Sequence, residues 1–517
     1  MNTIITQINS KQFNICKHNI EELLNVTDIQ TYFPILNNYL IEDTDTEETN
    51  YTLKTTYIID KIIEDTTPII NKTNTPYLKT FANVSLRNIY DNKTCNKDLF
   101  IKINPLLDVT GYVLNQFKLT NNILPNENSN ITSNYINNFN NEAYIDPFFS
   151  YLGSKLTETG KTPSFPKFYG TYSCISKKFK FDITEDYSQI KYNTIFDKNK
   201  HTLFDIEEIE IDMDDSDTCS DISHNSLEII SNDILNLESI DNVRSEIENI
   251  SSLEDLKETY KPNNSNTVKI TDIDNNYNFT DIIDDNNTFK FINLKDFPTQ
   301  LIFIEKLEYT LDDLMENEDI SDEEWLSILF QICFGLAVVQ KKYNFVHNDL
   351  HSSNIMFSKT QQEFLFFEIN KKIYKIPTFG KITKIIDFGR ATFTHNNIIY
   401  FSSVFDENGD AEGQYDYPEE NSFKNCKLKP NKSFDLARLA TTIITYFDHD
   451  SIIFKLIKPW MTDKYNNFLI DEEDDFDLYK KIAKDVKNAI PIKQLSKPIF
   501  KTFITNKPNS HIHIFRY

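Results

Sequence analysis

Cysteine and glycine are both rare in this chain, with six and nine residues respectively among 517. No two cysteines have C-x-x-C or zinc-site spacing, so we expect ordinary reduced thiols and no structural metal. Apolar runs such as residues 301–304 are far shorter than the roughly 20 residues that span a bilayer. The first residues also lack a basic segment followed by an apolar core. We therefore expect a soluble intracellular protein, cytoplasmic or nuclear, without membrane association.

Positively charged residues are fewer than negatively charged ones, with 53 lysines and arginines against 78 aspartates and glutamates. The formal net charge is -25, and the isoelectric point is about 4.8. A field of this sign repels phosphate-rich partners and attracts basic ones. The composition therefore argues against nucleic-acid binding and favours a protein substrate of basic character. It indicates nothing about the oligomeric state.

The length of 517 residues suits a two-part enzyme with insertions. Residues 1–75 mix apolar clusters with acidic loops, and we interpret them as an N-terminal extension. Between residues 77 and 109, β-branched and aromatic residues alternate with turn-forming residues. This pattern predicts three antiparallel strands, at residues 77–84, 86–90 and 99–103.

The next part of the chain alternates between ordered and acidic segments. Residues 142–156 predict a helix, with Pro147 in its first turn or at a kink. Residues 165–172 predict a strand. The stretch of about 182–291 is acidic and rich in serine and asparagine, so we interpret it as a largely disordered insertion.

Helical signals dominate the second half of the chain. After a predicted buried strand at residues 299–305, Ser321 and Glu324 form a capping-box pattern that opens a helix. Apolar residues at helical spacing continue from there almost to His347. The run of residues 436–446 is apolar nearly all round, which predicts a buried helix.

The loop that begins at His347 contains the residues best suited to chemistry. Residues 347–350 read His-Asn-Asp-Leu, and Asn354 follows five residues after Asp349 (354 − 349 = 5). Residues 387–389 read Asp-Phe-Gly and follow a β-branched apolar run. Each residue alone is an ordinary loop former. Their order, spacing and context together resemble the motifs of protein kinases.

This resemblance implies an α+β, bilobal fold. A small β-rich N-lobe would cover residues 76–305, including the insertion, and a mostly helical C-lobe would cover residues 306–517. By resemblance, Asp349 would accept the proton of the acceptor hydroxyl, and Asn354 and Asp387 would hold Mg²⁺. ATP would donate the phosphoryl group.

The resemblance also implies a nucleotide site in the N-lobe. The strand around Lys102 looks like the V-A-I-K strand, whose lysine contacts the nucleotide phosphates. Glu142 is the preferred ion-pair partner for this lysine, and Glu158 is the weaker alternative. Glu305, at the end of the predicted buried strand, and Leu307, just after it, complete the expected nucleotide contacts.

The phosphate loop departs from the family pattern, because no G-x-G-x-x-G segment exists in the chain. Counting back thirteen residues from Lys102 (102 − 89 = 13) places Ile89 at the valine position that borders the nucleotide. Ala82, Val84 and Arg87 then take the places of the glycines. A stiffer and bulkier loop would bind the nucleotide less well.

Two further positions bear on regulation and support. Asn348 replaces the arginine that usually pairs with a phosphorylated activation loop, so control by such phosphorylation is not expected. Asp435 resembles the helix-leading aspartate that braces the catalytic loop from within the fold. Residues 417–419, Tyr-Pro-Glu, could stand for the A-P-E motif.

The interval between Asn354 and Asp387 is 33 residues (387 − 354 = 33) and predicts an enlarged hairpin. With the histidine after Asp349-Leu350, it makes the chain resemble haspin-like kinases and divergent kinases of large DNA viruses, over residues 78–180 and 295–460. Three functions remain open: an active serine/threonine protein kinase, which the motifs favour, a small-molecule kinase of the aminoglycoside or choline kinase kind, or a pseudokinase scaffold.

Overall fold

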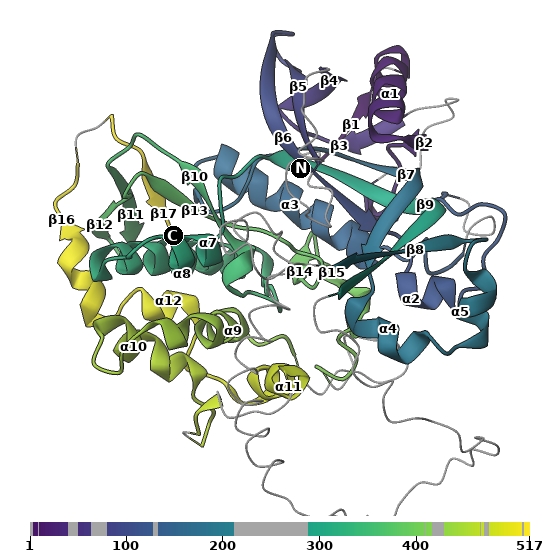
Figure 1. The fold of residues 1–517 in the computed structure, drawn as a ribbon. Helices are drawn as coiled ribbons and strands as arrows, with labels where there is room; N and C mark the ends of the chain where they lie inside the picture. The colour runs from purple at the N-terminus through teal and green to yellow at the C-terminus, as the bar shows by residue number, and fades with distance from the viewer. Residues whose placement is uncertain are drawn as a thin grey trace, which may run out of the picture.

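The computed structural model describes residues 4–8, 10–39, 50–63, 80–127, 133–210, 288–407, 409–415, 429–465, 467–469, 475–508 and 511–517. Within these ranges, strands dominate the N-terminal half and helices the C-terminal half (Figure 1). The chain therefore has a mixed α+β architecture. Residues 417–419 and most of the predicted acidic insertion lie outside the described residues.

A seven-stranded antiparallel sheet organises the N-terminal half. Its strands pair in the order β2-β7-β9-β6-β5-β4, and β8 pairs with β9 off this path. The strands are β2 (Val26–Gln30), β4 (Tyr57–Ile62), β5 (Thr80–Asn88), β6 (Thr94–Pro105), β7 (Phe168–Asp182), β8 (Phe204–Glu210) and β9 (Thr288–Glu305).

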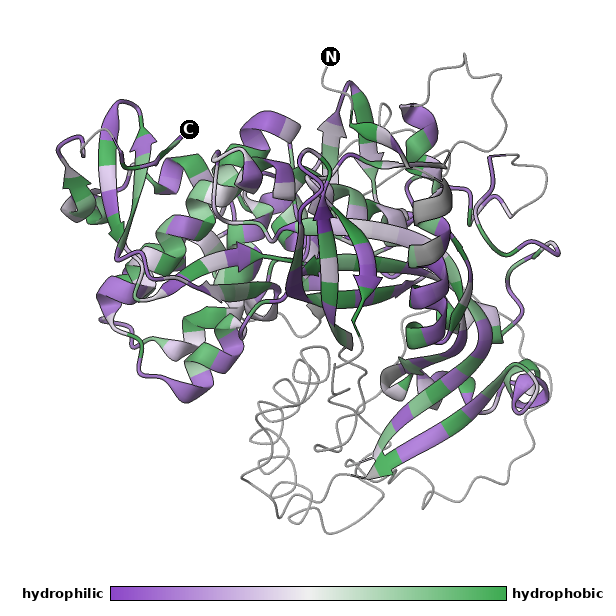
Figure 2. Ribbon diagram, turned by 90° about the horizontal axis from the view of Figure 1, so that it is seen from above, coloured by the Kyte–Doolittle hydropathy of each residue, from purple (hydrophilic) through white to green (hydrophobic). Residues whose placement is uncertain are grey.

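Residue alternation decides which side chains of the sheet face which helix. In β6, Leu99 and Ile101 are buried in an apolar cluster with helix α1 (Ser10–Leu24). Because neighbouring residues of a strand point to opposite faces, Phe100 and Lys102 project to the other side of the sheet. The same alternation of hydrophobic and hydrophilic residues is visible along the long strands (Figure 2). Lys102 is thereby aimed at helix α3 (Glu142–Glu158), which lies on that side (Figure 1).

Helix α3 is buried along nearly its whole length, because it lies between the sheet and the C-terminal half. Asn141 caps it by accepting a hydrogen bond from the backbone N–H of Ala143. Pro147 is inside the helix, beyond the first four residues whose N–H groups lack a helical acceptor, so it leaves the carbonyl of Ala143 without its usual helical donor. The helix predicted at residues 142–156 is thus confirmed.

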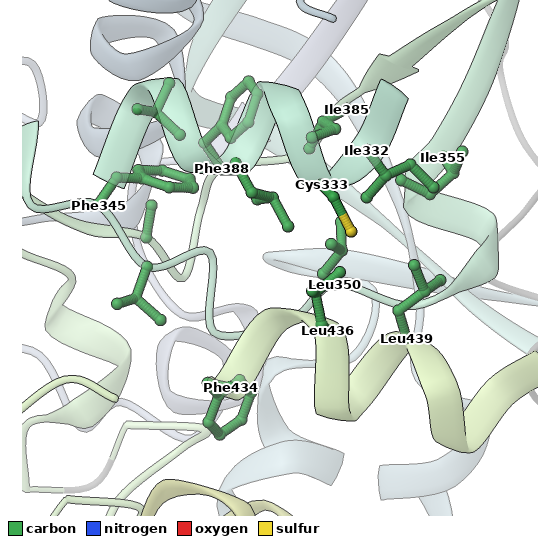
Figure 3. Packing of buried hydrophobic residues seen from close by; sticks show 14 of the residues in the cluster. Ile332, Cys333, Phe345, Leu350, Ile355, Ile385, Phe388, Phe434, Leu436 and Leu439 are labelled. Carbon is green, nitrogen blue, oxygen red and sulfur yellow. The ribbon is translucent and has the colours of Figure 1, made fainter. Parts of the chain in front are cut away.

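The core of the C-terminal half forms around helices α8 (Asp322–Tyr343) and α9 (Phe434–Ile443). Ser321 caps α8 as predicted, accepting from the backbone N–H of Glu324. Cys333 of α8, Leu436 of α9 and Leu350 of the intervening loop pack against one another (Figure 3). The loop from 347 to 354 is therefore held between two buried helices. The other described α-helices of this half are α7 (Leu311–Asn317), α10 (Ile452–Ile457), α11 (Asp475–Asp485) and α12 (Pro491–Gln494).

Short strand pairs lie on both sides of residue 387 in the sequence. Strand β10 (Ile355–Lys359) pairs with β13 (Lys381–Ile385), and β11 (Phe364–Ile369) pairs with β12 (Lys372–Pro377) between them. The prediction of an enlarged hairpin is confirmed. Strands β16 (Ile504–Thr505) and β17 (Ile514–Arg516) extend the inner pair into a four-stranded sheet. After residue 387, β14 (Thr392–His395) and β15 (Ile398–Phe401) form another hairpin.

The structure changes several boundaries that the sequence predicted. The predicted strands at 77–84 and 86–90 are parts of the single strand β5 in the described residues. The expected boundary at residue 75 separates strands that belong to one sheet, because β2 and β4 precede it. The described start of the predicted insertion is ordered and forms helices α4 (Thr184–Ile190) and α5 (Thr194–Asn199) and strand β8. No helix in the described ranges is both long and apolar enough to cross a bilayer.

Candidate functional site

Lys102 joins three separate parts of the chain through ion pairs. Its ammonium lies 2.8 Å from the carboxylate of Asp146 on α3 and 2.9 Å from that of Asp387. Burial acts to lower the pKa of Lys102, but these two carboxylates outweigh it and raise the pKa above its ordinary value. The lysine is therefore a fixed positive charge between the sheet, the helix and the Asp-Phe-Gly segment.

Asp146 is the helix residue that pairs with Lys102, so the preference for Glu142 and the alternative of Glu158 are both wrong. Glu158 lies at the other end of α3 and pairs with Lys155 at 2.8 Å. Glu142 lies about one turn before Asp146, and its side chain has no ion pair with Lys102 among the described contacts. Burial, reinforced by the charge of nearby carboxylates, raises the pKa of Glu142 to about 8.

Asp146 also fixes the segment at residues 387–389. Its Oδ2 accepts from Lys102 and, at 3.1 Å, from the amide of Asn104. Its Oδ1 accepts from the backbone N–H of Phe388 at 3.2 Å. One carboxylate thus couples the strand that carries Lys102 to the backbone beside Asp387.

Phe388 is buried in an aromatic cluster below α3. Its ring centroid lies 4.9 Å from that of Phe149 on α3 and 5.5 Å from that of His347. Phe345 and Phe388 are seen in the same packed region in Figure 3. Aromatic pairs at these separations contribute about 0.5–1.5 kcal/mol beyond burial. They hold Asp387 in the orientation that meets Lys102.

The loop of residues 347–354 is braced from below by Asp435. Its Oδ1 accepts from the backbone N–H of His347 at 2.9 Å and of Asn348 at 3.2 Å. Asn348 has a φ of 68°, and its amide donates to the carbonyl of Arg390 at 2.8 Å. The asparagine that replaces the usual arginine is therefore a buried, neutral link between two loops. The position predicted for Asp435 as a supporting residue is confirmed.

Asp349 is half-buried and is surrounded by groups that stabilise its charge. Tyr479 of α11 donates to Oδ1 at 2.5 Å, and Nε of Arg390 lies 3.8 Å from Oδ2. Burial acts to raise the pKa of Asp349, but Arg390, His351 and Tyr479 outweigh it and hold the pKa below its usual range. Asp349 is therefore ionised at neutral pH.

Asn354 lies next to Asp349 and Asp387. Its side-chain Nδ2 donates to the backbone carbonyl of Asp349 at 2.9 Å. The backbone carbonyl of Asn354 accepts from the backbone N–H of Ile386 at 3.1 Å. The described contacts of the amide use Nδ2, which leaves Oδ1 as its available oxygen. Burial opposes ionisation of Asp387, but Lys102 outweighs it and lowers the pKa of this carboxyl. The backbone bond of Asn354 to Ile386 brings its loop next to the segment of Asp387, and amide and carboxylate oxygens are ligands that suit Mg²⁺.

The residues predicted to contact the nucleotide are only partly brought together. Thr80 of β5 lies opposite Ile101 of β6, whereas Arg87 lies opposite Thr94. The turn of the β5–β6 hairpin therefore lies at the end of β6 that is opposite to Lys102. Ile89 follows the last residue of β5 and lies next to this turn. The placement of Ile89 beside the nucleotide is wrong for this reason.

The predicted phosphate loop is also misplaced. Ala82, Val84 and Arg87, which were expected in the loop, lie within strand β5. Residues 63–79 connect β4 to β5, and β5 begins at the end of the sheet that is near Lys102. This connection contains no glycine, and after residue 63 it lies outside the described residues. On the strands themselves, Phe81 and Phe100 lie opposite each other with ring centroids 5.5 Å apart. The face of β6 that carries Lys102 thus also carries an aromatic pair.

Glu305 and Leu307 lie at the end of β9, where the chain leaves the sheet for α7. Glu305 accepts from the backbone N–H of Lys167 at 3.0 Å, and Leu307 is buried. The ammonium of Lys306, between them, lies 4.9 Å from the ring centroid of Phe81. This connection therefore adjoins the aromatic pair on the Lys102 face of the sheet.

Comparison with known proteins adds independent information, although no protein-family model matches the chain. The serine/threonine-protein kinase haspin of Mus musculus is 35% identical over 91 residues, which cover 18% of this chain and 12% of that protein. The haspin homolog of Arabidopsis thaliana is 36% identical over 94 residues, covering 18% of this chain and 16% of that protein. This chain is similar to the haspin-like serine/threonine kinases.

The similarity extends to a virus but is partial everywhere. An uncharacterized protein, 098R, of Invertebrate iridescent virus 6 is 32% identical over 115 residues, covering 19% of each chain. The alignments with the mouse and Bos taurus haspins cover only 12% of those proteins. The similarity therefore supports a divergent, haspin-like relationship, and it does not describe the rest of the chain.

The sequence motifs do not include three residues of this site: Asp146, Arg390 and Tyr479. The kinase pattern has a glutamate at this place, whereas here an aspartate on the same helix reaches the lysine. Arg390 follows the Asp-Phe-Gly motif directly, and a cation at that position was a visible signal. Tyr479 lies 130 residues from Asp349 and had no local signal.

Replacing Asp435 by asparagine should remove a pH dependence of the stability of this chain. Burial raises the pKa of Asp435 to about 7, although the N–H groups of His347 and Asn348 oppose it. The carboxyl titrates near 3.9 in an unfolded chain, so the folded state binds more protons between about pH 4 and 7. The wild type therefore loses stability as the pH rises through this window.

Urea unfolding at pH 5 and pH 8 checks this expectation. The wild type should lose roughly 1–3 kcal/mol relative to Asp435→Asn between the two values. The variant itself is the reference, because all other titrating groups are shared. An identical pH dependence of the two proteins would contradict a raised pKa at this buried position.

Proposed function

We propose that this chain is an ATP-dependent serine/threonine protein kinase with a bilobal fold. The N-lobe would comprise the seven-stranded sheet with α3, and the C-lobe the helices from α7 onward. One observation carries the proposal: the Lys102 ammonium is paired with both Asp146 and Asp387. Such a pairing joins a strand lysine, a helix carboxylate and the Asp-Phe-Gly aspartate, the parts that kinases need in place for phosphoryl transfer.

In this proposal, each polar residue has a separate task. Asp349, ionised at neutral pH, would accept the proton of the substrate hydroxyl as that oxygen bonds to the γ-phosphorus and the bond from phosphorus to the bridging oxygen breaks, which releases ADP. Oδ1 of Asn354 and the carboxylate of Asp387 would hold Mg²⁺, which would supply positive charge against the phosphates of ATP. Lys102 contacts the phosphates and keeps Asp387 oriented. Their contacts with one another support this division of roles.

The base of the nucleotide would lie against the aromatic pair of Phe81 and Phe100, on the face of the sheet shared with Lys102. The connection at Glu305 and Leu307 would supply backbone groups to its edge, as the resemblance implies. Since the expected place of Ile89 is excluded by the strand register, Ile89 is not part of this site. Phosphate contacts would have to come from a connection without glycine.

Substrate and location follow from charge and similarity. A net charge of -25 favours a basic protein segment as the acceptor and disfavours nucleic acid. The names of the similar proteins support a protein rather than a small molecule as the substrate. An intracellular site of action, cytoplasmic or nuclear, and the absence of membrane association belong to the same proposal.

Binding of Mg-ATP should stabilise the protein measurably. At a concentration of 100 times Kd, a ligand adds about 2.7 kcal/mol to the free energy of unfolding. Thermal unfolding with Mg-ATP, with ATP plus a chelator, and with no nucleotide measures this effect. Asp387→Asn should abolish the magnesium-dependent part, because it removes the carboxylate proposed to hold the ion.

A transfer assay completes the test. With γ-labelled ATP, label should enter serine or threonine of a basic protein, and a panel of amino alcohols and aminoglycosides should remain unlabelled. Asp448→Asn, at an exposed position away from the site, serves as the matched control. Label only in the small molecules, or no effect of nucleotide on unfolding, would overturn the proposal.

A further inference from the structure

A tyrosine from the last third of the chain contacts the carboxylate proposed as the base. Tyr479 lies on α11 and donates its hydroxyl hydrogen to Oδ1 of Asp349 at 2.5 Å. The two residues are 130 positions apart, so this contact depends on the tertiary fold. It is a charge-assisted hydrogen bond, a class stronger than neutral ones.

The hydroxyl of Tyr479 is itself held in place. Nε of Arg438 on α9 donates to it at 2.9 Å, and the Arg438 guanidinium lies 5.0 Å from the ring centroid. The ring also packs against Phe434, with centroids 5.8 Å apart. Tyr479 is only 7% exposed. Ring and hydroxyl are therefore fixed by α9, the same helix that carries the brace Asp435.

Helix α11 is anchored to the core and does not rest on the loop by Tyr479 alone. Ile482 and Ala483 of this helix are fully buried in the main apolar core. The amide of Asn431 donates to the carbonyls of Ile482 at 3.0 Å and of Val486 at 2.6 Å, which satisfies the end of the helix. Such an anchor suits a fixed support better than a lid that opens.

The contact distinguishes the two oxygens of Asp349. Oδ1 is engaged by Tyr479, and Oδ2 faces Nε of Arg390 at 3.8 Å, beyond hydrogen-bonding distance. The torsion that turns an aspartate carboxylate is broad, so an unsupported group samples many orientations. A rigid donor on one oxygen selects the orientation in which the other oxygen is presented. Reactions between positioned groups depend steeply on such orientation.

We propose that Tyr479 is a positioning residue, whose hydroxyl holds Asp349 so that Oδ2 is the oxygen that receives the substrate proton. The inference rests on the proposed kinase function, because it assigns a support to the base of that reaction. Arg438 acts one step further away, by orienting the hydroxyl of Tyr479. Neither residue touches nucleotide or acceptor in this arrangement.

Removal of this hydroxyl separates a positioning role from a packing role. Tyr479→Phe keeps the ring against Phe434 and deletes only the hydrogen bond to Asp349. We expect kcat to fall about tenfold, in the range of one hydrogen bond to a charged group, while KM for Mg-ATP stays unchanged. Tyr446→Phe, which removes an exposed hydroxyl bonded to the carbonyl of Glu318, should leave both constants unchanged.

A second variant guards against a simple folding defect. Arg438→Gln should lower kcat less than Tyr479→Phe, and adding it to Tyr479→Phe should cause little further loss, because the two residues act through one hydroxyl. An unchanged kcat in Tyr479→Phe would overturn the positioning role and leave the proposed kinase function intact. A higher kcat would also overturn it, because it would show that the hydroxyl hinders Asp349. If the losses of kcat in Arg438→Gln and Tyr479→Phe were additive in the double variant, Arg438 would not act through the hydroxyl of Tyr479. A wild-type chain without any phosphoryl transfer would overturn the proposed function and this role with it.

Discussion

Replacing Asp349 by asparagine should lower kcat for protein phosphorylation by about a thousandfold, within the 10²–10⁴ range of general-base catalysis. The side chain keeps its shape, so Oδ1 can still accept from Tyr479. What is lost is the charge that receives the substrate proton. Initial rates with γ-labelled ATP and a basic protein, measured at saturating Mg-ATP, give kcat directly.

The rest of the site should survive this substitution. Asn354 donates to the backbone carbonyl of Asp349 and not to its side chain, so the proposed Mg²⁺ ligands keep their positions. The Mg-ATP-induced increase in unfolding free energy should therefore persist in Asp349→Asn. Asp448→Asn is the matched control, because it makes the same chemical change at an exposed position. Transfer within tenfold of the wild type by Asp349→Asn would contradict the role of this residue as the base.

Local motifs made the loops of the site predictable from the sequence. Residues 347–354 and 387–389 each adopt short, constrained conformations, for which residue type and spacing carry most of the information. The capping pattern at Ser321 and the apolar residues of α8 predicted the helix that leads into the first loop, since these signals act within a few turns. Asn354 bonds to the backbones of Asp349 and Ile386, so the two loops meet, and the roles of Asp349, Asn354 and Asp387 stay predictions.

Contacts between distant elements were harder to predict. The offset of Ile89 from Lys102 was taken from a family spacing, whereas strand pairing places the turn of the hairpin beside Ile89. A register depends on the partners of a strand, which the strand's own sequence does not contain. The contact of Tyr479 with Asp349 depends on how α11 packs against α9, so no local pattern could reveal it.

The choice of Asp146 over Glu142 has the same origin. Both acidic residues lie in the first turns of one helix, and the sequence does not state which of them faces the sheet. Four residues advance a helix by slightly more than a turn, so the two side chains share a side but differ in height by about 6 Å. The height of Lys102 on β6 then decides which carboxylate it can meet. Only the packing of α3 against the sheet sets that height.

Replacing Asp146 by alanine should therefore damage both stability and rate. The substitution removes the carboxylate that pairs with Lys102 and leaves the backbone N–H of Phe388 without its acceptor. We expect the free energy of unfolding to fall by about 3 kcal/mol, because buried polar groups lose their partner. Lys102 would pair with Asp387 alone, and a displacement of these reacting groups should lower kcat about a hundredfold. Urea unfolding and initial rates measure the two effects.

Glu142→Gln provides the control that separates the two carboxylates. Since the pKa of Glu142 is raised to about 8, its side chain is mostly protonated at pH 7, and glutamine imitates that neutral form. The variant should keep wild-type stability and transfer rate at this pH. If Glu142→Gln caused the larger loss and Asp146→Ala the smaller one, the pairing of Lys102 with Asp146 would not be the contact that organises the site. The reverse order supports a kinase in which an aspartate, tied to both Lys102 and the Phe388 backbone, takes the place of the usual glutamate.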